Sequence, residues 1–347
     1  GGAVYAFLSE LDAWWRSHGE ATAQAEVSTS GPPPALPLPT PGTYDDYLRT
    51  HSGPRGSMRV RSFLSSTIGV DPDSASSHAN LAVYFFTLVA MGLVRPGEGL
   101  SATRAAAQRA VDLDPSVGIA HALLAIVVAV QDRDWTEAGH AFDRALGCPV
   151  VPPSVRFHHA TWYLSPQGRH QEALAQVRLA LADDPLYLLG HVQVGLELLS
   201  LGRINEGIGE LRRVLTIDSH FGPALGHLGR ELALMGDRDE ALQLAERAYA
   251  AIPLHPNAVG FLAGLLRRTG EDARAESLFR SLAQERDWGL HRARAESLIV
   301  CGEFERALEA MHAATTERDP GLWLLMAGTA GPRLRSSAGW AWGRGAH

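Results

Sequence analysis

The chain has 347 residues, of which 46% are hydrophobic and 20% charged, as expected for a globular protein with a packed core. Its 31 Lys and Arg against 38 Asp and Glu leave a formal net charge of −7, which does not favour a long nucleic-acid-binding face. All 31 basic residues are Arg, so this chain excludes chemistry that requires a lysine, such as Schiff-base formation or a phosphate-binding P-loop.

Neither a disulfide framework nor a membrane span is predicted. The two cysteines, Cys148 and Cys301, are far apart, and each falls in an apolar helical pattern where a free thiol packs as a small hydrophobic group. The longest apolar runs, 81–94 and 119–130, are shorter than the roughly 18 residues that a spanning helix needs. We therefore expect a cytoplasmic protein without a membrane partner, and the initial Gly1-Gly2 indicates a fragment or a processed chain.

Residues 1–19 combine a strand-like run, Val4–Leu8, with a helix start in which Ser9 is the N-cap. The segment from Val4 to Trp15 resembles the last wing strand and closing helix of excisionase-like and MerR-like winged-helix domains of bacterial regulators. The helix-turn-helix of such domains is absent from this sequence, so we expect no nucleic-acid binding by this chain alone. An ordinary amphipathic helix with a core tryptophan is the alternative interpretation. The proline-rich residues 20–56 predict a linker.

From about residue 75 to 318 the sequence predicts helices separated by turns, and the turn residues recur every 34 residues, with a last step of 32. A turn glycine is preceded by a small residue seven positions earlier and followed by another five positions later. The glycines are Gly168, Gly202, Gly236, Gly270 and Gly302; the earlier residues are Thr161, Gly195, Gly229, Ala263 and Ala295; the later ones are Ala173, Gly207, Ala241, Ala275 and Ala307. Such a period indicates a solenoid, in which each helical hairpin stacks on its neighbours to bury its apolar face.

Asp-Pro dipeptides begin at Asp114, Asp184 and Asp319, between predicted helices. Together with the 34-residue period, they resemble the pattern of the tetratricopeptide repeat family. The resemblance implies an all-α fold, an α-solenoid of tetratricopeptide-type helix hairpins wound into a right-handed superhelix. We expect degenerate hairpins in residues 57–150 and a regular array in 151–318. Residues 319–347 are expected to form a capping segment and a frayed tail.

No catalytic, cofactor or metal site is predicted, because the sequence carries no zinc-ligand spacing, no nucleophile elbow and no glycine-rich phosphate loop. In such a solenoid the first helix of each hairpin lines a concave groove. The glycine register places nine side chains there: His158, Trp162, Val192, Leu196, Leu199, Arg230, Arg267, Arg292 and Glu296. We expect an apolar first half and a basic second half with exposed arginines, suited to an acidic or amphipathic protein or peptide. The competing interpretation is that any solenoid groove contains a few large side chains.

The chain is interpreted as a non-enzymatic scaffold for protein–protein interaction, the sensory or partner-binding array of a bacterial regulatory protein. One alternative is a regulatory segment of a signalling enzyme, a Ser/Thr kinase or a cyclase, whose catalytic domain is not in this sequence. A stand-alone hydrolase with a site that escapes motif search is the less favoured alternative.

Overall fold

The structure, a computed structural model, describes residues 71–286 and 288–337. The predicted winged-helix remnant in 1–19, the linker in 20–56 and the tail after residue 337 lie outside the described residues. The chain divides into two units, residues 1–62 and 63–347, and all described residues belong to the second. Within this described part every regular element is a helix, which confirms the all-α class.

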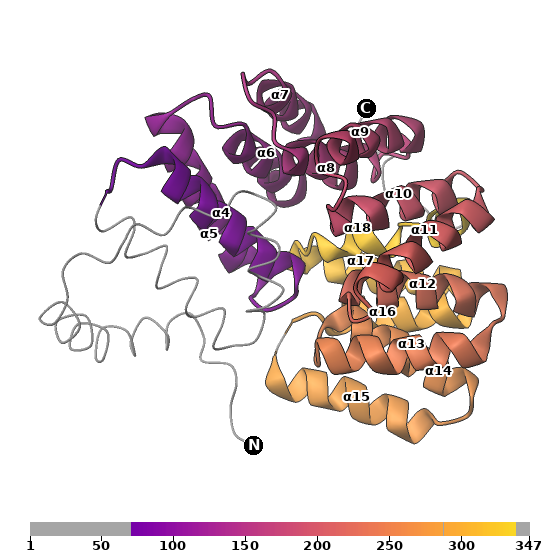
Figure 1. Ribbon diagram of the computed structural model, residues 1–347. Coiled ribbons are helices and arrows are strands. Elements are labelled where there is room, and N and C mark those ends of the chain that lie inside the picture. The colour runs from indigo at the N-terminus through magenta and orange to yellow at the C-terminus, as the bar shows by residue number, and fades with distance from the viewer. Residues whose placement is uncertain (1–70, 287, 338–347) are drawn as a thin grey trace, which may run out of the picture. The chain divides into compact units, whose positions relative to one another are not determined.

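Fourteen of the helices pair in chain order into seven hairpins, stacked one after the other (Figure 1). The pairs are α4 (Ala75–Ala90) with α5 (Pro96–Leu113), α6 (Gly118–Val127) with α7 (Trp135–Leu146), α8 (Pro153–His159) with α9 (His170–Asp183), α10 (Leu188–Ser200) with α11 (Ile204–Ile217), α12 (Gly222–Met235) with α13 (Arg238–Ala251), α14 (Pro256–Arg268) with α15 (Asp272–Glu285), and α16 (Leu290–Cys301) with α17 (Phe304–Ala314). Two short helices, α18 (Gly321–Leu325) and α19 (Ala330–Ser336), follow the last hairpin.

Three short helical turns of other types adjoin these helices. The π-helical turns Val128–Asp132 and Ala160–Leu164 extend α6 and α8, and the 3-10 turn Thr315–Glu317 follows α17. The two π-helical turns thus lengthen the first helices of the second and third hairpins.

The predicted turn glycines separate the first helix of a hairpin from the second. Gly168, Gly202, Gly236, Gly270 and Gly302 all have a positive φ, between 77° and 98°. A side chain is strained in this left-handed conformation, so glycine ends the first helix at little steric cost. In the second hairpin the corresponding turn is made by Arg133, whose φ of 59° is also positive. These observations confirm the register predicted from the sequence.

The small residues of the register let the two helices of a hairpin approach closely. A Cβ atom added to Gly207 in α11 would lie 2.7 Å from the carbonyl oxygen of Gly195 in α10. The same addition to Gly260 in α14 would lie 2.1 Å from the carbonyl oxygen of Ala293 in α16, so neighbouring first helices are also in close contact. Such distances are far below van der Waals contact and leave no room for a side chain.

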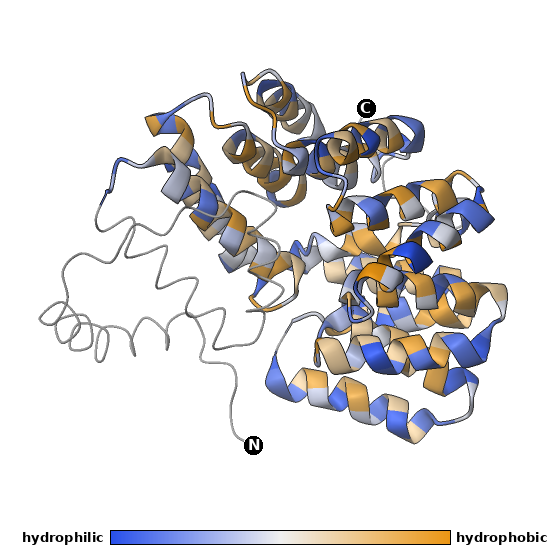
Figure 2. Ribbon diagram, viewed as in Figure 1, coloured by the Kyte–Doolittle hydropathy of each residue, from blue (hydrophilic) through white to orange (hydrophobic). Residues whose placement is uncertain are grey.

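Apolar side chains of neighbouring helices pack into shared cores. Figure 2 shows hydrophobic and hydrophilic residues alternating along the helices, with hydrophilic residues frequent on the outer faces. The last hairpin is closed by α18 and α19, whose Leu325 and Leu334 are fully buried against Ile299 of α16 and Met311 of α17. Burying a leucine side chain contributes roughly 1.5–3 kcal/mol, so α18 and α19 are a stable part of this unit.

The first hairpin also contacts the later ones. Arg286, just after α15, donates to the carbonyl oxygen of Gly92 in the turn between α4 and α5, at 2.6 Å. A Cβ atom on Gly92 would lie 3.0 Å from Pro256 at the start of α14. The turn after α4 therefore packs on the start of α14 and the end of α15, although Gly92 and Arg286 are 194 residues apart in sequence.

Candidate functional site

The C-terminal segment, defined here as residues 319–337, lies against the first helices of the later hairpins. It contacts α10 through α19 and α16 through α18, while α19 also packs on α17. In Figure 1 α18 is seen in yellow among α10, α12 and α16. We call the side of α10, α12 and α16 that meets this segment the inner face. The side chains of the inner face were expected to line an open groove, and here they hold a stretch of the chain itself.

Arg230 of α12 binds two main-chain carbonyl groups of the C-terminal segment. Its guanidinium donates to the carbonyl oxygen of Leu324 at 3.2 Å and to that of Ala327 at 2.8 Å. Leu324 lies in the last turn of α18, and its carbonyl also accepts from the N–H of Ala327 at 3.3 Å. Ala327 lies two residues beyond the helix end, where carbonyl groups no longer have the partners of a continuing helix. Arg230 thus satisfies the C-terminal end of a short helix, and its positive charge is favourable there.

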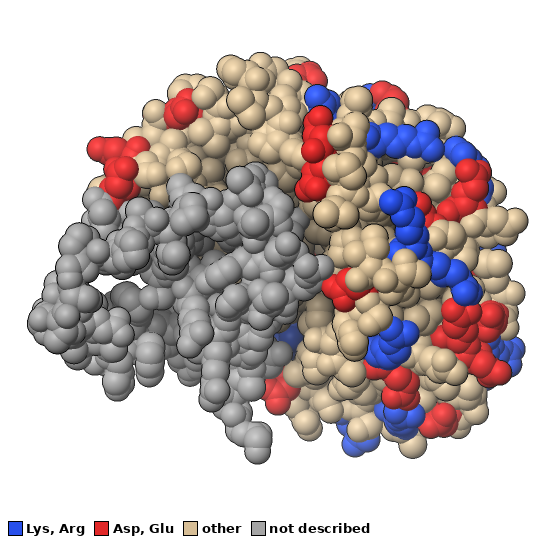
Figure 3. Space-filling model, in the orientation of Figure 1, with Lys and Arg blue, Asp and Glu red and all other residues tan. Residues whose placement is uncertain are grey.

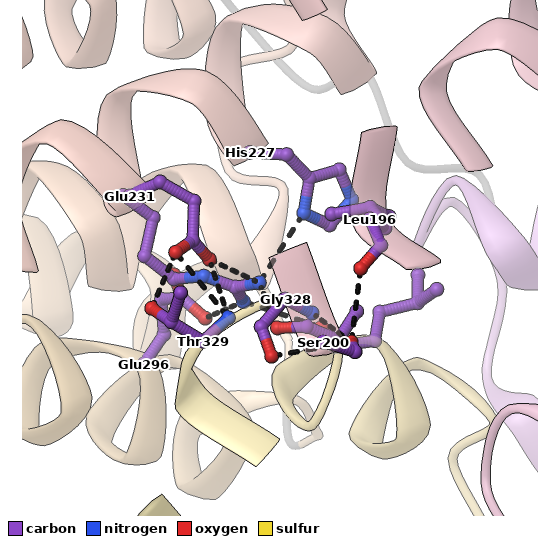
Figure 4. Close-up of polar contacts among 10 residues, drawn as sticks. Leu196, Ser200, His227, Glu231, Glu296, Gly328 and Thr329 are labelled. Carbon is purple, nitrogen blue, oxygen red and sulfur yellow. Dashed lines mark hydrogen bonds and ion pairs between the residues drawn. The ribbon is translucent and has the colours of Figure 1, made fainter. Parts of the chain in front are cut away.

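Glu231 and Ser200 bind the next two residues of the segment, as Figure 4 shows. The main-chain N–H of Thr329 lies 3.3 Å from both carboxylate oxygens of Glu231, and the Thr329 hydroxyl donates to the same carboxylate. Ser200 Oγ accepts from the N–H of Gly328 at 3.1 Å. We call Ser200, Arg230 and Glu231 the main-chain clamp, because most of their contacts with the segment are to backbone atoms.

Arg292 of α16 anchors the start of the segment through an ion pair. Its guanidinium donates to Asp319 Oδ1 at 2.7 Å, and both side chains are no more than 1% exposed. The same carboxylate oxygen accepts from the N–H of Gly321 at 2.8 Å. A Cβ atom on Gly321 would lie 1.6 Å from the Arg292 guanidinium, so a side chain at this position would displace the guanidinium from its place beside Asp319.

The charges around the clamp are close to balanced. Arg230 lies 3.8 Å from the carboxylate of Glu231 and 3.5 Å from that of Glu296. Burial raises the pKa of Glu296, and the Arg230 guanidinium partly opposes this shift. Burial, helped by the nearby Arg230, lowers the pKa of His227 to about 3, so its ring is neutral and Nδ1 can accept from Arg230 at 3.4 Å.

The far end of the segment meets α9 and α10 through a polar chain. Arg335 donates to His170 Nε2 at 3.1 Å, and His170 Nδ1 lies 2.8 Å from Glu197 Oε2. These two contacts fit a ring that donates from Nδ1 and accepts at Nε2. Gln193 donates to the other oxygen of Glu197. Polar contacts therefore run along the segment from Asp319 to Arg335.

The structure corrects the expectation of exposed groove arginines. Seven of the nine predicted side chains are buried: Trp162, Val192, Leu196, Leu199, Arg230, Arg292 and Glu296. The physical reason is coverage by the chain itself. The C-terminal segment covers Arg230 and Arg292, and Phe86 of α4 packs edge-on against Trp162 with ring centres 5.4 Å apart.

The remaining predicted residues fall into separate places. Val192, Leu196 and Leu199 belong to the apolar core shared by α10 to α16. Arg267 is 30% exposed and lies 3.9 Å from Glu303 at the start of α17, so it does not join the clamp. His158 is partly buried beside Phe86, and burial lowers its pKa to about 4. Of the nine, the structure places Arg230, Arg292 and Glu296 around the C-terminal segment.

Sequence reasoning missed four side chains that complete the site, namely Ser200, Glu231, Asp319 and Thr329. One signal was available for Glu231. It lies next to Arg230 on the first helix of its hairpin. The equivalent position is Glu197 in the preceding repeat and Leu265 in the following one. Ionisable residues at positions that should be buried are costly unless they have partners, so adjacent buried charges predict a bound polar group.

The outer surface carries charges of both signs close together, as seen over α11, α13 and α15 in Figure 3. Arg212 of α11 pairs with Glu240 of α13 at 2.6 Å, and Arg274 of α15 pairs with Glu246 of α13 at 2.8 Å. These half-exposed pairs contribute little to stability or specificity. Among the described residues no group of three or more His, Cys, Asp or Glu could hold a metal ion, and none of the described helices is long and apolar enough to cross a membrane.

The fold and the sequence identify the class of protein. Residues 228–290 match the family model of the tetratricopeptide repeat. The described part of the chain is an α-solenoid of tetratricopeptide-type hairpins, as the turn glycines and the helix pairing already indicated. No curated protein is a significant match to the sequence.

Several solved structures share the fold. Yeast Tom70 matches with a TM-score of 0.51 and 14% identity, over 96% of this chain and 77% of that chain. Human IFIT1, in a dimer with PPP-AAAA, matches with a TM-score of 0.54 and 17% identity, over 78% and 68%. The Cut9–Hcn1 hetero-tetramer of APC/C matches with a TM-score of 0.52 and 12% identity, over 74% and 46%. At these identities the likeness concerns the fold alone.

Proposed function

We propose that this chain is a non-enzymatic scaffold for protein–protein interaction that acts through its inner face. Proteins with this repeat fold generally mediate such interactions. The observation that carries the proposal is the main-chain clamp, in which Arg230 and Glu231 bind carbonyl and amide groups of a peptide segment. Arg292 and Glu296 belong to the same face and complete its charge pattern.

The finer part of the proposal is a place in a cytoplasmic bacterial regulator, with the repeats as its sensory array. It is supported by the resemblance of Val4–Trp15 to a winged-helix ending, and these residues lie outside the described part of the chain. A solenoid suits this role, because successive hairpins present a long surface to a partner and each contacts only its neighbours.

Affinity capture followed by reconstitution tests the proposed function. The full chain is immobilised, exposed to an extract of its source cells, and each specifically retained protein is then purified and titrated against the purified chain. We expect at least one protein to bind saturably with both components pure. Arg280→Glu, an exposed change on α15, is the control and should leave the affinity unchanged. Absence of any such protein would refute the scaffold role.

A further inference from the structure

We propose that the main-chain clamp is a peptide-binding site whose external ligand is a partner segment of the same chemistry as residues 319–329, which replaces the chain's own C-terminal segment. This inference rests on the proposed function and adds the class of partner and the way in which the site is regulated. The partner segment is expected to share the sequence pattern of residues 319–329. That pattern is an acidic residue, any residue and glycine, followed by an apolar helical turn, and then glycine and a hydroxyl-bearing residue.

The contacts separate what the site requires from what it tolerates. Arg230 and Ser200 address only backbone atoms of Leu324, Ala327 and Gly328, so they do not depend on which side chains those residues carry. Recognition through main-chain groups gives affinity, while side-chain pockets give specificity. The clamp can therefore accept other sequences that make the same turn.

Two glycines and two polar side chains set the specificity. A Cβ atom at Gly321 would meet Arg292, and one at Gly328, where φ is +71°, would lie 2.2 Å from the Glu231 carboxylate. The carboxylate of Asp319 neutralises the buried guanidinium of Arg292. Among the described residues, no other carboxylate forms an ion pair with Arg292. The Thr329 hydroxyl supplies one of the donors to Glu231.

An incoming segment must also supply apolar side chains. Leu322, Leu325 and Met326 are at most 3% exposed and close the core of the last hairpin. Their removal without replacement would expose that core to water. The partner is therefore a segment with an amphipathic helical turn, and an acidic tail without apolar residues does not fit.

The chain's own segment competes because it is tethered. Residues 315–318 join it to α17, and a short connection of this kind gives an effective concentration on the order of 1 mM. A free peptide of identical sequence should then show an apparent Kd of about 1 mM on the wild-type chain, because the site is open only a small fraction of the time. Any change that loosens the tethered segment should tighten the apparent Kd by the same factor.

The test uses the full chain and a fluorescent synthetic peptide of residues 315–337, with binding read by anisotropy. The variant Gly328→Ala loosens the tethered segment and leaves the clamp intact. Gly202→Ala is the matched control, because Gly202 also has a positive φ of 78° but no atom within 4 Å of the added Cβ. A second loosening variant, Asp319→Asn, keeps the test independent of one substitution, and circular dichroism verifies that every chain is folded.

We expect the Gly328→Ala and Asp319→Asn chains to bind the peptide at least tenfold more tightly than wild type, with an apparent Kd of about 0.1 mM or lower. The Gly202→Ala chain should match wild type, and a peptide that carries the Gly328→Ala change should bind none of them. Equal affinity of the loosened and wild-type chains would overturn the proposal. So would peptide-independent dimers of the loosened chains in light scattering, since the segment would then exchange between copies.

The two proposals can fail separately. If the peptide fails to bind the loosened chains while a purified partner binds the full chain, the inference is wrong and the scaffold role stands. If no partner can be reconstituted, the proposed function fails whatever the peptide does.

Discussion

The close approach of α14 and α16 predicts opposite effects for one substitution at two glycines. Gly260 faces α16, and an added Cβ atom would lie 2.1 Å from the Ala293 carbonyl oxygen and 2.7 Å from Glu296 Cβ. Gly226 lies within α12, and nothing is within 4 Å of its added Cβ atom. The change Gly→Ala is the same in both, so helix propensity cancels and only the packing differs.

The magnitudes follow from these distances. Alanine in place of glycine inside a helix contributes about 0.5–1 kcal/mol of stability, which Gly226→Ala should show in full. At Gly260 the two helices must move apart, and overpacking of this kind costs about 1–3 kcal/mol, which exceeds the gain in propensity. We expect Gly260→Ala to be net destabilising by about 1–2 kcal/mol.

Thermal unfolding followed by far-UV circular dichroism measures both effects. At about 2–4 °C per kcal/mol for a protein of this size, the Tm of Gly226→Ala should rise by about 1–4 °C. The Tm of Gly260→Ala should fall by about 2–8 °C. A rise for both variants would refute the close spacing of α14 and α16, because it would mean that α14 has room for a side chain on the side of α16.

Three further predictions concern the site and its surroundings. Arg230→Met should lower the Tm strongly, at a cost of about 3–5 kcal/mol, because it leaves two carbonyl groups and the neighbouring carboxylates without their cation. Arg267→Met removes one half-exposed ion pair and should change stability by less than about 1 kcal/mol. Equal losses of stability in the two melts would contradict the buried role of Arg230. Gly328→Ala should be more destabilising than Gly202→Ala in urea titrations, because both distort a positive φ but only the former also meets a carboxylate oxygen. Burial lowers the pKa of His158 from 6.5 to about 4, so the unfolded chain binds this proton at a higher pH than the folded chain does. Stability therefore falls as the pH drops from about 6.5 to 4. His158→Phe should flatten the curve of Tm against pH in that window, and an unchanged slope would contradict the buried, neutral state of His158.

The hairpins were predictable from the sequence because their signals are local. Gly168 and Gly202 end helices through their own backbone freedom, and Gly195 and Gly207 are small because two helices meet there. Such requirements recur at a fixed step in every unit, so periodicity alone reveals them. In the second hairpin Arg133 adopts the positive φ at the turn, so this hairpin keeps the same kind of turn without a glycine.

The occupant of the inner face could not be predicted in the same way. The contacts of Arg230 with Leu324 and Ala327 join residues 94 and 97 positions apart, and residues 319–337 follow no repeat register. A groove lined by Arg230 and Arg292 therefore looked open and basic from the sequence. The adjacent charges of Arg230 and Glu231 on a helix that should be buried were the one sign that a polar partner covers them.

Amide hydrogen exchange of residues 319–337 in the full chain tests most directly whether the C-terminal segment is held on the inner face. The N–H of Gly328 donates to Ser200 and that of Thr329 donates to Glu231. Both amides should therefore exchange slowly, at the rate at which the neighbouring hairpins unfold. We predict strong protection of these two amides in wild type and its loss in Gly328→Ala, with the amides of α15, which packs on α14 and α16, unaffected. Exchange of Gly328 and Thr329 in wild type at the rate of an unstructured peptide would contradict the account.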